Sequence, residues 1–271
     1  MGEIKYINFF GLKISVFEID ELRSYIKESV KSRQKKILFG YSLGTFPYFK
    51  KHPEIAVFSN QFDVSVTDGR GLYLLGKILG YPVKSDLSIP NMSKMVMELA
   101  DENRFSVMII GSSPENNLKA TENARKSYPN AIFYDGHDGG WFTPEDQLIT
   151  VGKISKVKPD ILLIGVSSPK KEAFAATWKE KLDVKIIVPF GGAIDILSGK
   201  SKPIPRIIKK LAIGSIWRFI QEPKRLFRDS ILYPLNVMFL LLPSLLLTVY
   251  VLRRPFSIPK FYNRSCEAPI M

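Results

Sequence analysis

Four short segments of this sequence hold the residues that are best suited to chemistry. The first runs from Thr67 to Gly71 and reads TDGRG after a short run of β-branched residues. Its glycines allow a ligand to approach the backbone, and a carboxylate within reach of a hydroxyl can accept its proton. Asp68 is therefore a candidate general base. An ordinary turn formed by Asp68 and Gly69 is an equally weighted alternative.

The second segment, SSPKKE, places Lys170 and Lys171 in the first turn of an expected helix. The positive end of the helix dipole opposes a lysine there, at a cost of about 0.3 to 1 kcal/mol each. An anion bound at the same helix end would reverse that effect, because backbone NH groups and both ammonium groups could face it. The segment thus predicts a diphosphate site, and two solvated lysines that point away are the alternative.

The other two segments are glycine-rich turns. FGGAIDILSG contains the paired Gly191 and Gly192 with Asp195 close behind them, and an acid in this place can hold ribose hydroxyls. YDGHDGGWF contains Gly136 and Gly139 together with two aspartates and three aromatic residues. This composition suits the lining of a sugar pocket and also suits an ordinary loop.

The elements that must position these segments alternate between strand and helix. Short apolar runs predict strands at 37–41, 64–67, 105–110, 131–134, 161–166 and 185–190. Such alternation is typical of a parallel sheet with helices on both faces, and ligands bind at the carboxyl ends of its strands. We therefore expect a Rossmann-like α/β domain over residues 1–200.

Two of the expected strand-to-helix junctions have the same sequence pattern. Residues 108–117 and 163–172 both read strand, glycine, two serines, proline and helix. Serine is a favoured helix N-cap and proline a favoured first helical residue. Both junctions therefore predict a helix that begins at the proline, and this structural role is an alternative to ligand binding.

Composition limits the classes of protein. The chain has 271 residues, a net charge of +13 and one cysteine, Cys266, so it forms no intrachain disulfide. With only two histidines, a zinc site of nitrogen and sulfur ligands is not expected. The first twenty residues do not resemble a signal peptide, and the positive charge favours anionic partners.

The C-terminal part changes in character after Lys200. Residues 201–230 are rich in basic and aromatic residues and predict basic amphipathic helices, whereas no charged residue lies between Asp229 and Arg253. Residues 231–252 are long enough, at about 1.5 Å per residue, to cross a hydrocarbon core of about 30 Å.

We therefore expect a membrane-embedded segment at 231–252, followed by a basic polar tail at 253–271. Pro234 and Pro243 make a re-entrant hairpin an alternative to a span, and a buried core helix is a third reading. Basic residues flank this segment on both sides. They favour a cytoplasmic location for both of its ends and anionic lipids as partners. Nucleic acid is not an expected partner.

The order and the sequences of these segments resemble those of the WecG/TagA/CpsF family of glycosyltransferases, whose members transfer a sugar from UDP to a lipid-linked acceptor. The similarity spans roughly residues 37–228. It is carried by TDGRG, IGSSPENN, GHDGGWF, SSPKKE, FGGAIDILSGK and WRFIQEPKRLFR. The resemblance implies an inverting transfer to a polyprenyl-diphosphate-linked sugar at the cytoplasmic face of a bacterial membrane, with no cofactor and no required metal.

The resemblance also assigns roles to residues. Asp68 matches the proposed base, and Asp195 matches the acid of the nucleotide pocket. Three arginines of the C-terminal appendage are implied to close over the active site and meet the leaving diphosphate: Arg218, Arg225 and Arg228. The remaining expected contacts to substrate are Thr67, Gly69, Gly111, Ser112, Gly136, Gly139, Gly165, Pro169, Lys170, Lys171, Glu172, Gly191 and Gly192.

Some positions depart from the family pattern. Lys171 stands where the family usually has glutamine, Ser42 where many relatives have asparagine, and residues 84–87 lack a common arginine and glycine. These departures leave open a rival reading, a membrane-anchored nucleotide-sugar-binding protein without catalysis. A dinucleotide-dependent oxidoreductase is disfavoured because no GxGxxG follows a strand. The sequence does not decide between a monomer and a homo-oligomer.

Overall fold

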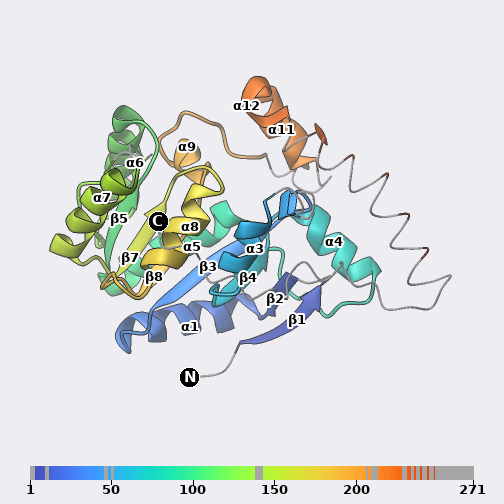
Figure 1. The fold of residues 1–271 in the computed structure, drawn as a ribbon, viewed down its shortest axis with the longest axis horizontal. Coiled ribbons are helices and arrows are strands. Elements are labelled where there is room, and N and C mark those ends of the chain that lie inside the picture. Colours follow the sequence, from blue (N-terminus) through green and yellow to red (C-terminus); the bar gives the residue numbers. More distant parts are fainter. Residues whose placement is uncertain are drawn as a thin grey trace.

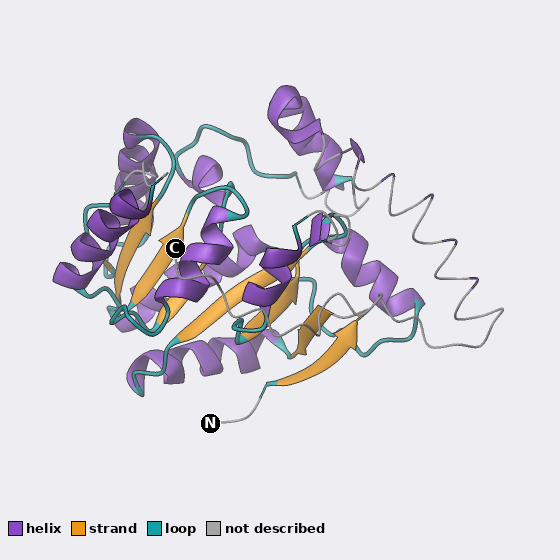
Figure 2. Ribbon diagram, viewed as in Figure 1, coloured by secondary structure: helices purple, strands orange, loops and turns teal. Residues whose placement is uncertain are grey.

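The structure of the chain is a computed structural model. It describes residues 4–9, 12–45, 48–49, 52–137, 143–205, 207–208 and 213–227, together with single positions between 231 and 247. Its centre is a parallel sheet of six strands with helices on both faces (Figures 1 and 2). The predicted α/β class is confirmed.

All six predicted strands are present, one of them with the predicted bounds (64–67) and five with shifted ends. They lie in the order β4-β3-β8-β7-β5-β6, and every neighbouring pair is parallel. Their bounds are β3 Lys36–Tyr41, β4 Val64–Thr67, β5 Ser106–Ile110, β6 Ile132–Phe133, β7 Ile161–Ile164 and β8 Ile186–Val188.

Alternating side chains of the strands enter two separate cores. In β7, Ile161 and Leu163 pack on one face of the sheet, and Leu162 and Ile164 on the other. The first face is covered by α1 Ile19–Lys31, α5 Ile89–Asn103, α6 Pro114–Ser127 and α9 Ala193–Leu197. The second is covered by α3 Pro53–Ser59, α4 Arg70–Ile78, α7 Pro144–Val157 and α8 Lys170–Trp178. Because both faces are buried, the strands read as continuous apolar runs.

An N-terminal hairpin was not among the predicted elements. Strands β1 Lys5–Phe9 and β2 Leu12–Val16 pair antiparallel, and Phe9, Leu12 and Ile14 enter the second core. The Ser15 hydroxyl accepts a hydrogen bond of 3.0 Å from the Ser65 amide of β4. The hairpin therefore supports the strand that precedes Asp68.

The two strand-to-helix junctions that share a sequence pattern fold differently. Helix α6 begins as predicted, with Ser113 as N-cap accepting from the Asn116 amide and Pro114 as the first helical residue. The prediction for α8 is wrong, because the helix begins at Lys170 with Pro169 as N-cap and no side-chain cap. The Ser168 hydroxyl instead donates to the Glu172 carboxylate at 2.6 Å.

In the basic appendage, the short helices α11 Gly214–Gln221 and α12 Pro223–Phe227 lie beyond the carboxyl ends of the strands (Figure 1). Among the described residues, none of the helices combines the length and the apolar character that crossing a membrane requires. Most of the expected embedded segment 231–252, and all of the tail 253–271, lie outside the described residues.

Candidate active site

Asp68 lies directly after β4, at the carboxyl edge of the sheet. Its amide donates to the Tyr41 carbonyl at 2.6 Å, and its Oδ1 accepts from the Ile89 amide at 2.9 Å. Gly40 makes this packing possible, because a Cβ there would lie 2.7 Å from the Ile89 side chain and 3.1 Å from the Asp68 Cβ. The backbone of β3, β4 and α5 thus fixes the position of the carboxylate.

The surroundings of Asp68 hinder its ionisation. Burial raises the pKa of its carboxyl above the ordinary value of 3.8, and the charge of Asp86 raises it further. The Ile89 amide, Arg218 and Lys171 act in the opposite direction without cancelling the effect of burial. A carboxylate with a raised pKa holds a transferred proton better than an ordinary aspartate does.

Lys171 belongs to a buried polar cluster at the start of α8. Its Nζ lies 2.5 Å from Glu172 Oε1 and also contacts the Ser168 hydroxyl. Glu172 is only 2% exposed, and its Oε2 is buried with no hydrogen-bond partner among the described residues. This ion pair gives Lys171 a structural partner that was not expected from the sequence.

Asp195 lies in α9, behind the paired glycines that follow β8. It is 6% exposed, accepts from the Asn116 amide group at 2.9 Å, and lies 3.6 Å from Lys200 Nζ. Asn116 also donates to the Ser112 hydroxyl at 2.6 Å. Two predicted segments, 110–117 and 190–200, therefore meet at one carboxylate.

Asn116 and Asn117 were not predicted as site residues. Asn117 donates to the carbonyls of Gly111 at 2.9 Å and His137 at 3.2 Å, and so holds the turn after β5. The signal was the pair of amides in SSPENN, because amide side chains that follow a helix N-cap can bond to the adjacent strand ends.

Three of the predicted ligand-contact glycines have a packing role. A Cβ on Gly111, which has a φ of +108°, would lie 2.6 Å from the Gly165 carbonyl carbon. A Cβ on Gly165 would lie 2.8 Å from Ile194, and one on Gly136 would overlap the Asn117 side chain. Space around Gly69 is open, since nothing lies within 4 Å of a Cβ there. For all of these glycines, contact with substrate remains a prediction.

The start of the appendage is joined to the end of α11 by a polar seam of four residues, Ser201, Lys202, Gln221 and Glu222. Gln221 Oε1 accepts from the Lys202 amide at 2.6 Å, and the Ser201 hydroxyl donates to Glu222 at 3.0 Å. A cavity of about 10 Å³ between Gly192 and Arg218 is too small for a ligand. Arg218 lines this cavity together with Gly192 of the turn after β8, and its charge lowers the pKa of Asp68.

Two predicted site residues, Gly139 and Arg228, lie outside the described residues, as does the side chain of Arg225. The described part of the chain contains no group of three or more histidine, cysteine or acidic residues that could hold a metal ion. Independence from metal remains a prediction.

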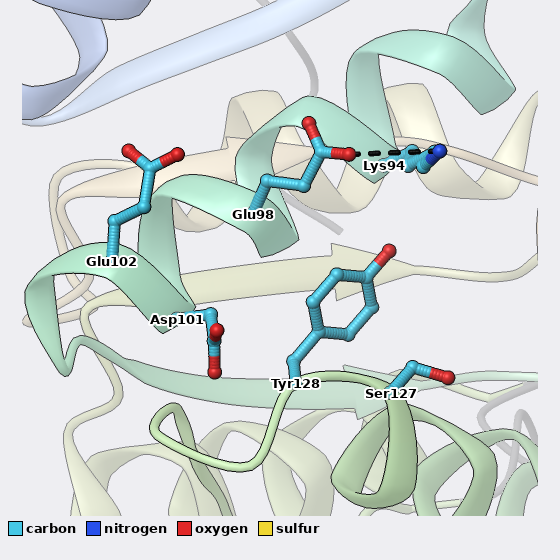
Figure 3. Close-up of a pocket in the computed structure, with 6 residues that line it drawn as sticks. All are labelled: Lys94, Glu98, Asp101, Glu102, Ser127 and Tyr128. Carbon is cyan, nitrogen blue, oxygen red and sulfur yellow. Dashed lines mark ion pairs between the residues drawn. The ribbon is translucent and has the colours of Figure 1, made fainter.

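A separate open pocket of about 500 Å³ lies on α5 and the end of α6 (Figure 3). Its carboxylates already have partners: Glu98 pairs with Lys94 at 3.6 Å, and Asp101 accepts from the Asn130 amide at 2.7 Å. Burial, together with Glu98 and Asp101, raises the pKa of Tyr128. This pocket shares no residue with the site around Asp68.

The parallel sheet, with a carboxylate of raised pKa and cationic side chains at its carboxyl edge, has the arrangement of an α/β enzyme that acts on an anionic substrate. Residues 7–249 match the model of the glycosyl transferase WecG/TagA/CpsF family. The chain belongs to that family and is a glycosyltransferase.

Named relatives agree with this assignment. An N-acetylglucosaminyldiphosphoundecaprenol N-acetyl-beta-D-mannosaminyltransferase of Staphylococcus aureus strain MRSA252 is 27% identical over 181 residues, which cover 67% of this chain and 70% of the relative. The protein of the same name from strain MW2 is 26% identical with the same coverage.

Proposed function

We propose that this enzyme transfers a sugar from a UDP-sugar to a polyprenyl-diphosphate-linked sugar, with inversion, in the synthesis of a bacterial surface polymer. The observation that carries the proposal is the half-buried carboxylate of Asp68 at the carboxyl edge of the sheet, where the charges of Arg218 and Lys171 influence its pKa. The names of the relatives, which contain N-acetylglucosaminyldiphosphoundecaprenol, support an acceptor of this class.

In the proposed reaction, an acceptor hydroxyl attacks the anomeric carbon of the donor sugar. The bond from that carbon to the diphosphate oxygen breaks, and UDP leaves with the electron pair. Asp68 accepts the hydroxyl proton as the new glycosidic bond forms, which is general-base catalysis. Attack opposite the leaving group inverts the configuration.

The negative charge that develops on the diphosphate requires compensation. Arg218 is held at the site by the contacts of α11, and Arg225 and Arg228 follow in the same appendage. Fixed cationic donors aimed at a developing negative charge can supply this stabilisation from the protein itself. We therefore infer that the enzyme needs no metal ion.

The acceptor is lipid-linked, so we place the reaction at the cytoplasmic face of the membrane. Helix α11 exposes Ile216 and Ile220 by 44% and 67%, and the exposed Lys224 of α12 provides positive charge. Apolar and basic residues on a short helix suit contact with anionic lipids. The uncharged segment 231–252 would add membrane residence.

A direct assay tests the proposed function. The purified full chain is incubated with UDP-sugars, UDP-N-acetylmannosamine first, and a synthetic alkyl-diphosphate-linked N-acetylglucosamine. We expect a disaccharide product with the configuration at the transferred anomeric centre inverted. Donor binding without product for every UDP-sugar would contradict the proposal and favour a binding protein.

A further inference from the structure

Arg70 and Asp86 form an incomplete polar pair beside Asp68. The distance from Arg70 Nε to Asp86 Oδ2 is 3.9 Å, which allows attraction but is too long for a hydrogen bond. Arg70 Nε and Asp86 Oδ1 are both buried, and neither atom has a hydrogen-bond partner among the described residues. Such atoms are rare in folded proteins and call for a physical explanation.

The loop that carries Asp86 is firmly attached around the base. The Thr67 hydroxyl donates to the Ser85 carbonyl at 3.1 Å, and the Ser85 hydroxyl donates to the Phe17 carbonyl at 2.7 Å. Just beyond the loop, the Ile89 amide donates to Asp68. Because its neighbours are held on both sides, the gap between Arg70 and Asp86 is a built feature of the site.

The order of the strands indicates which substrate would reach this pair. Strand β4 is the edge of the sheet, and β3 separates it from β8, β7 and β5. The segments assigned to the donor nucleotide follow β5, β7 and β8. Arg70 and Asp86 follow β4, and α4 lies at the β4 end of the sheet (Figure 1). They therefore lie on the side of Asp68 that is left for the acceptor.

The chemistry of the pair selects the kind of group. A phosphate would be repelled by Asp86, and a cation would be repelled by Arg70. A hydroxyl group can accept a hydrogen bond from Arg70 Nε while it donates one to Asp86. One neutral group can therefore supply the missing hydrogen-bond partner of both side chains. A sugar presents several such hydroxyls.

We propose that Arg70 and Asp86 together bind a hydroxyl of the acceptor sugar other than the attacking one, and so hold the sugar beside Asp68. This proposal rests on the proposed function, because it assumes a sugar acceptor. It assigns to the two residues a specificity role that is distinct from proton transfer and from recognition of the donor.

Steady-state kinetics of Arg70→Lys and Asp86→Asn test the proposal. We expect the acceptor KM to rise about tenfold, which corresponds to about 1.4 kcal/mol, because each change removes part of the binding geometry. The donor KM and kcat should stay within about threefold. The matched control is Lys84→Ala, which removes an exposed ion pair with Glu18 on the same loop and should leave all three parameters unchanged.

Acceptors that each lack one hydroxyl identify the bound group. One deoxy acceptor should lose about tenfold in kcat/KM with the wild-type enzyme and almost nothing further with Asp86→Asn, since the two changes remove the same interaction. Thermal unfolding of each variant checks that the fold is intact.

Two results would overturn this assignment while leaving the proposed function intact. One is a fall in kcat at unchanged acceptor KM, which would make the pair a support for Asp68. The other is an equal loss for every deoxy acceptor in wild type and variants. If the wild-type enzyme transfers no sugar to any acceptor, the proposed function itself fails, and this inference fails with it.

Discussion

The two aspartates that face the carboxyl edge of the sheet are held in opposite ways. Asp195, in the helix after β8, is bonded to Asn116 and lies next to Lys200. The carboxylate of Asp68, after β4, accepts a hydrogen bond from the Ile89 amide, and burial raises its pKa. Asp195 is suited to fixing a ligand, whereas Asp68 is suited to accepting a proton. The comparison shows that an acid's surroundings, more than its place after a strand, determine its role.

Replacement of Asp68 should have the largest effect on transfer. We expect Asp68→Asn to lower kcat by about 10²-fold or more, which is the usual contribution of a general base. Donor binding should remain, because the residues assigned to the donor lie elsewhere. Product formation and donor titration on the same preparation measure both. Near-normal turnover would remove Asp68 from the mechanism and end the contrast with Asp195.

Replacement of Arg218 should have the next largest effect. Loss of a charge-assisted hydrogen bond to the diphosphate costs about 1.5 to 3 kcal/mol, so Arg218→Ala should lose about 10- to 100-fold in kcat. Lys224→Ala is the control, because it removes an exposed positive charge from the same appendage. Both are assayed with a water-soluble acceptor. Equal losses in the two variants would indicate a general effect of charge.

Asn116→Ala tests the Asp195 side of the comparison. We expect the donor KM to rise about tenfold while kcat changes less, because Asp195 loses the amide that orients it. Asn123→Ala is the matched control, since it also removes a side-chain hydrogen bond from α6, to the Leu197 carbonyl at 3.0 Å, without touching Asp195. A fall in kcat alone would place Asp195 in the chemical step.

The raised pKa of Asp68 predicts a dependence on pH. Only the ionised carboxyl can accept the proton, so kcat/KM should fall as the pH is lowered through a value above 3.8. Arg218 lowers this pKa, so Arg218→Ala should move the acidic limb to higher pH. The pH profiles of the two enzymes measure the shift, and a shift to lower pH would contradict the electrostatic assignment.

The same pKa affects stability with a definite sign. In the folded state Asp68 binds its proton more tightly than in the unfolded state, so its contribution to stability declines as pH rises from 3.8 through the raised pKa. Asp68→Asn lacks this decline and should unfold at an equal or higher temperature than wild type at neutral pH. A lower melting temperature would show that the carboxylate stabilises the fold.

Removal of metal ions should have the smallest effect. We expect transfer to continue in EDTA, because Arg218 and its neighbours are assigned to the diphosphate. Loss of activity that Mg²⁺ or Mn²⁺ restores would contradict this prediction. Part of the charge compensation assigned to the basic side chains would then belong to a bound metal ion.

The sheet was largely predictable because its strands are buried on both faces. Runs such as Ile161–Ile164 carry a strong apolar signal, and a turn residue follows each strand. The hairpin of β1 and β2 was missed, although Ile7, Phe9, Leu12 and Ile14 contribute to the second core. Each of its strands has only five residues, so its alternating pattern is short and gives a weak signal.

The site was predictable where a residue's place follows from the end of a strand. Asp68 and Asp195 were found in this way. Asn116, Arg70 and Asp86 were not, since their roles depend on contacts between segments far apart in sequence, such as the 3.9 Å gap across the loop after α4. The start of α8 was misplaced because its serine hydroxyl bonds to a carboxylate in preference to the helix end.

The seam between Ser201–Lys202 and Gln221–Glu222 determines how the enzyme can be recombined. A junction placed at residue 200, the expected domain boundary, would separate Lys200, which pairs with Asp195, from the two residues that hold α11. Chimeras that exchange membrane appendages between relatives should therefore take all of residues 198–222 from the same parent protein. In this chain, the seam and the two segments that form it must be exchanged together.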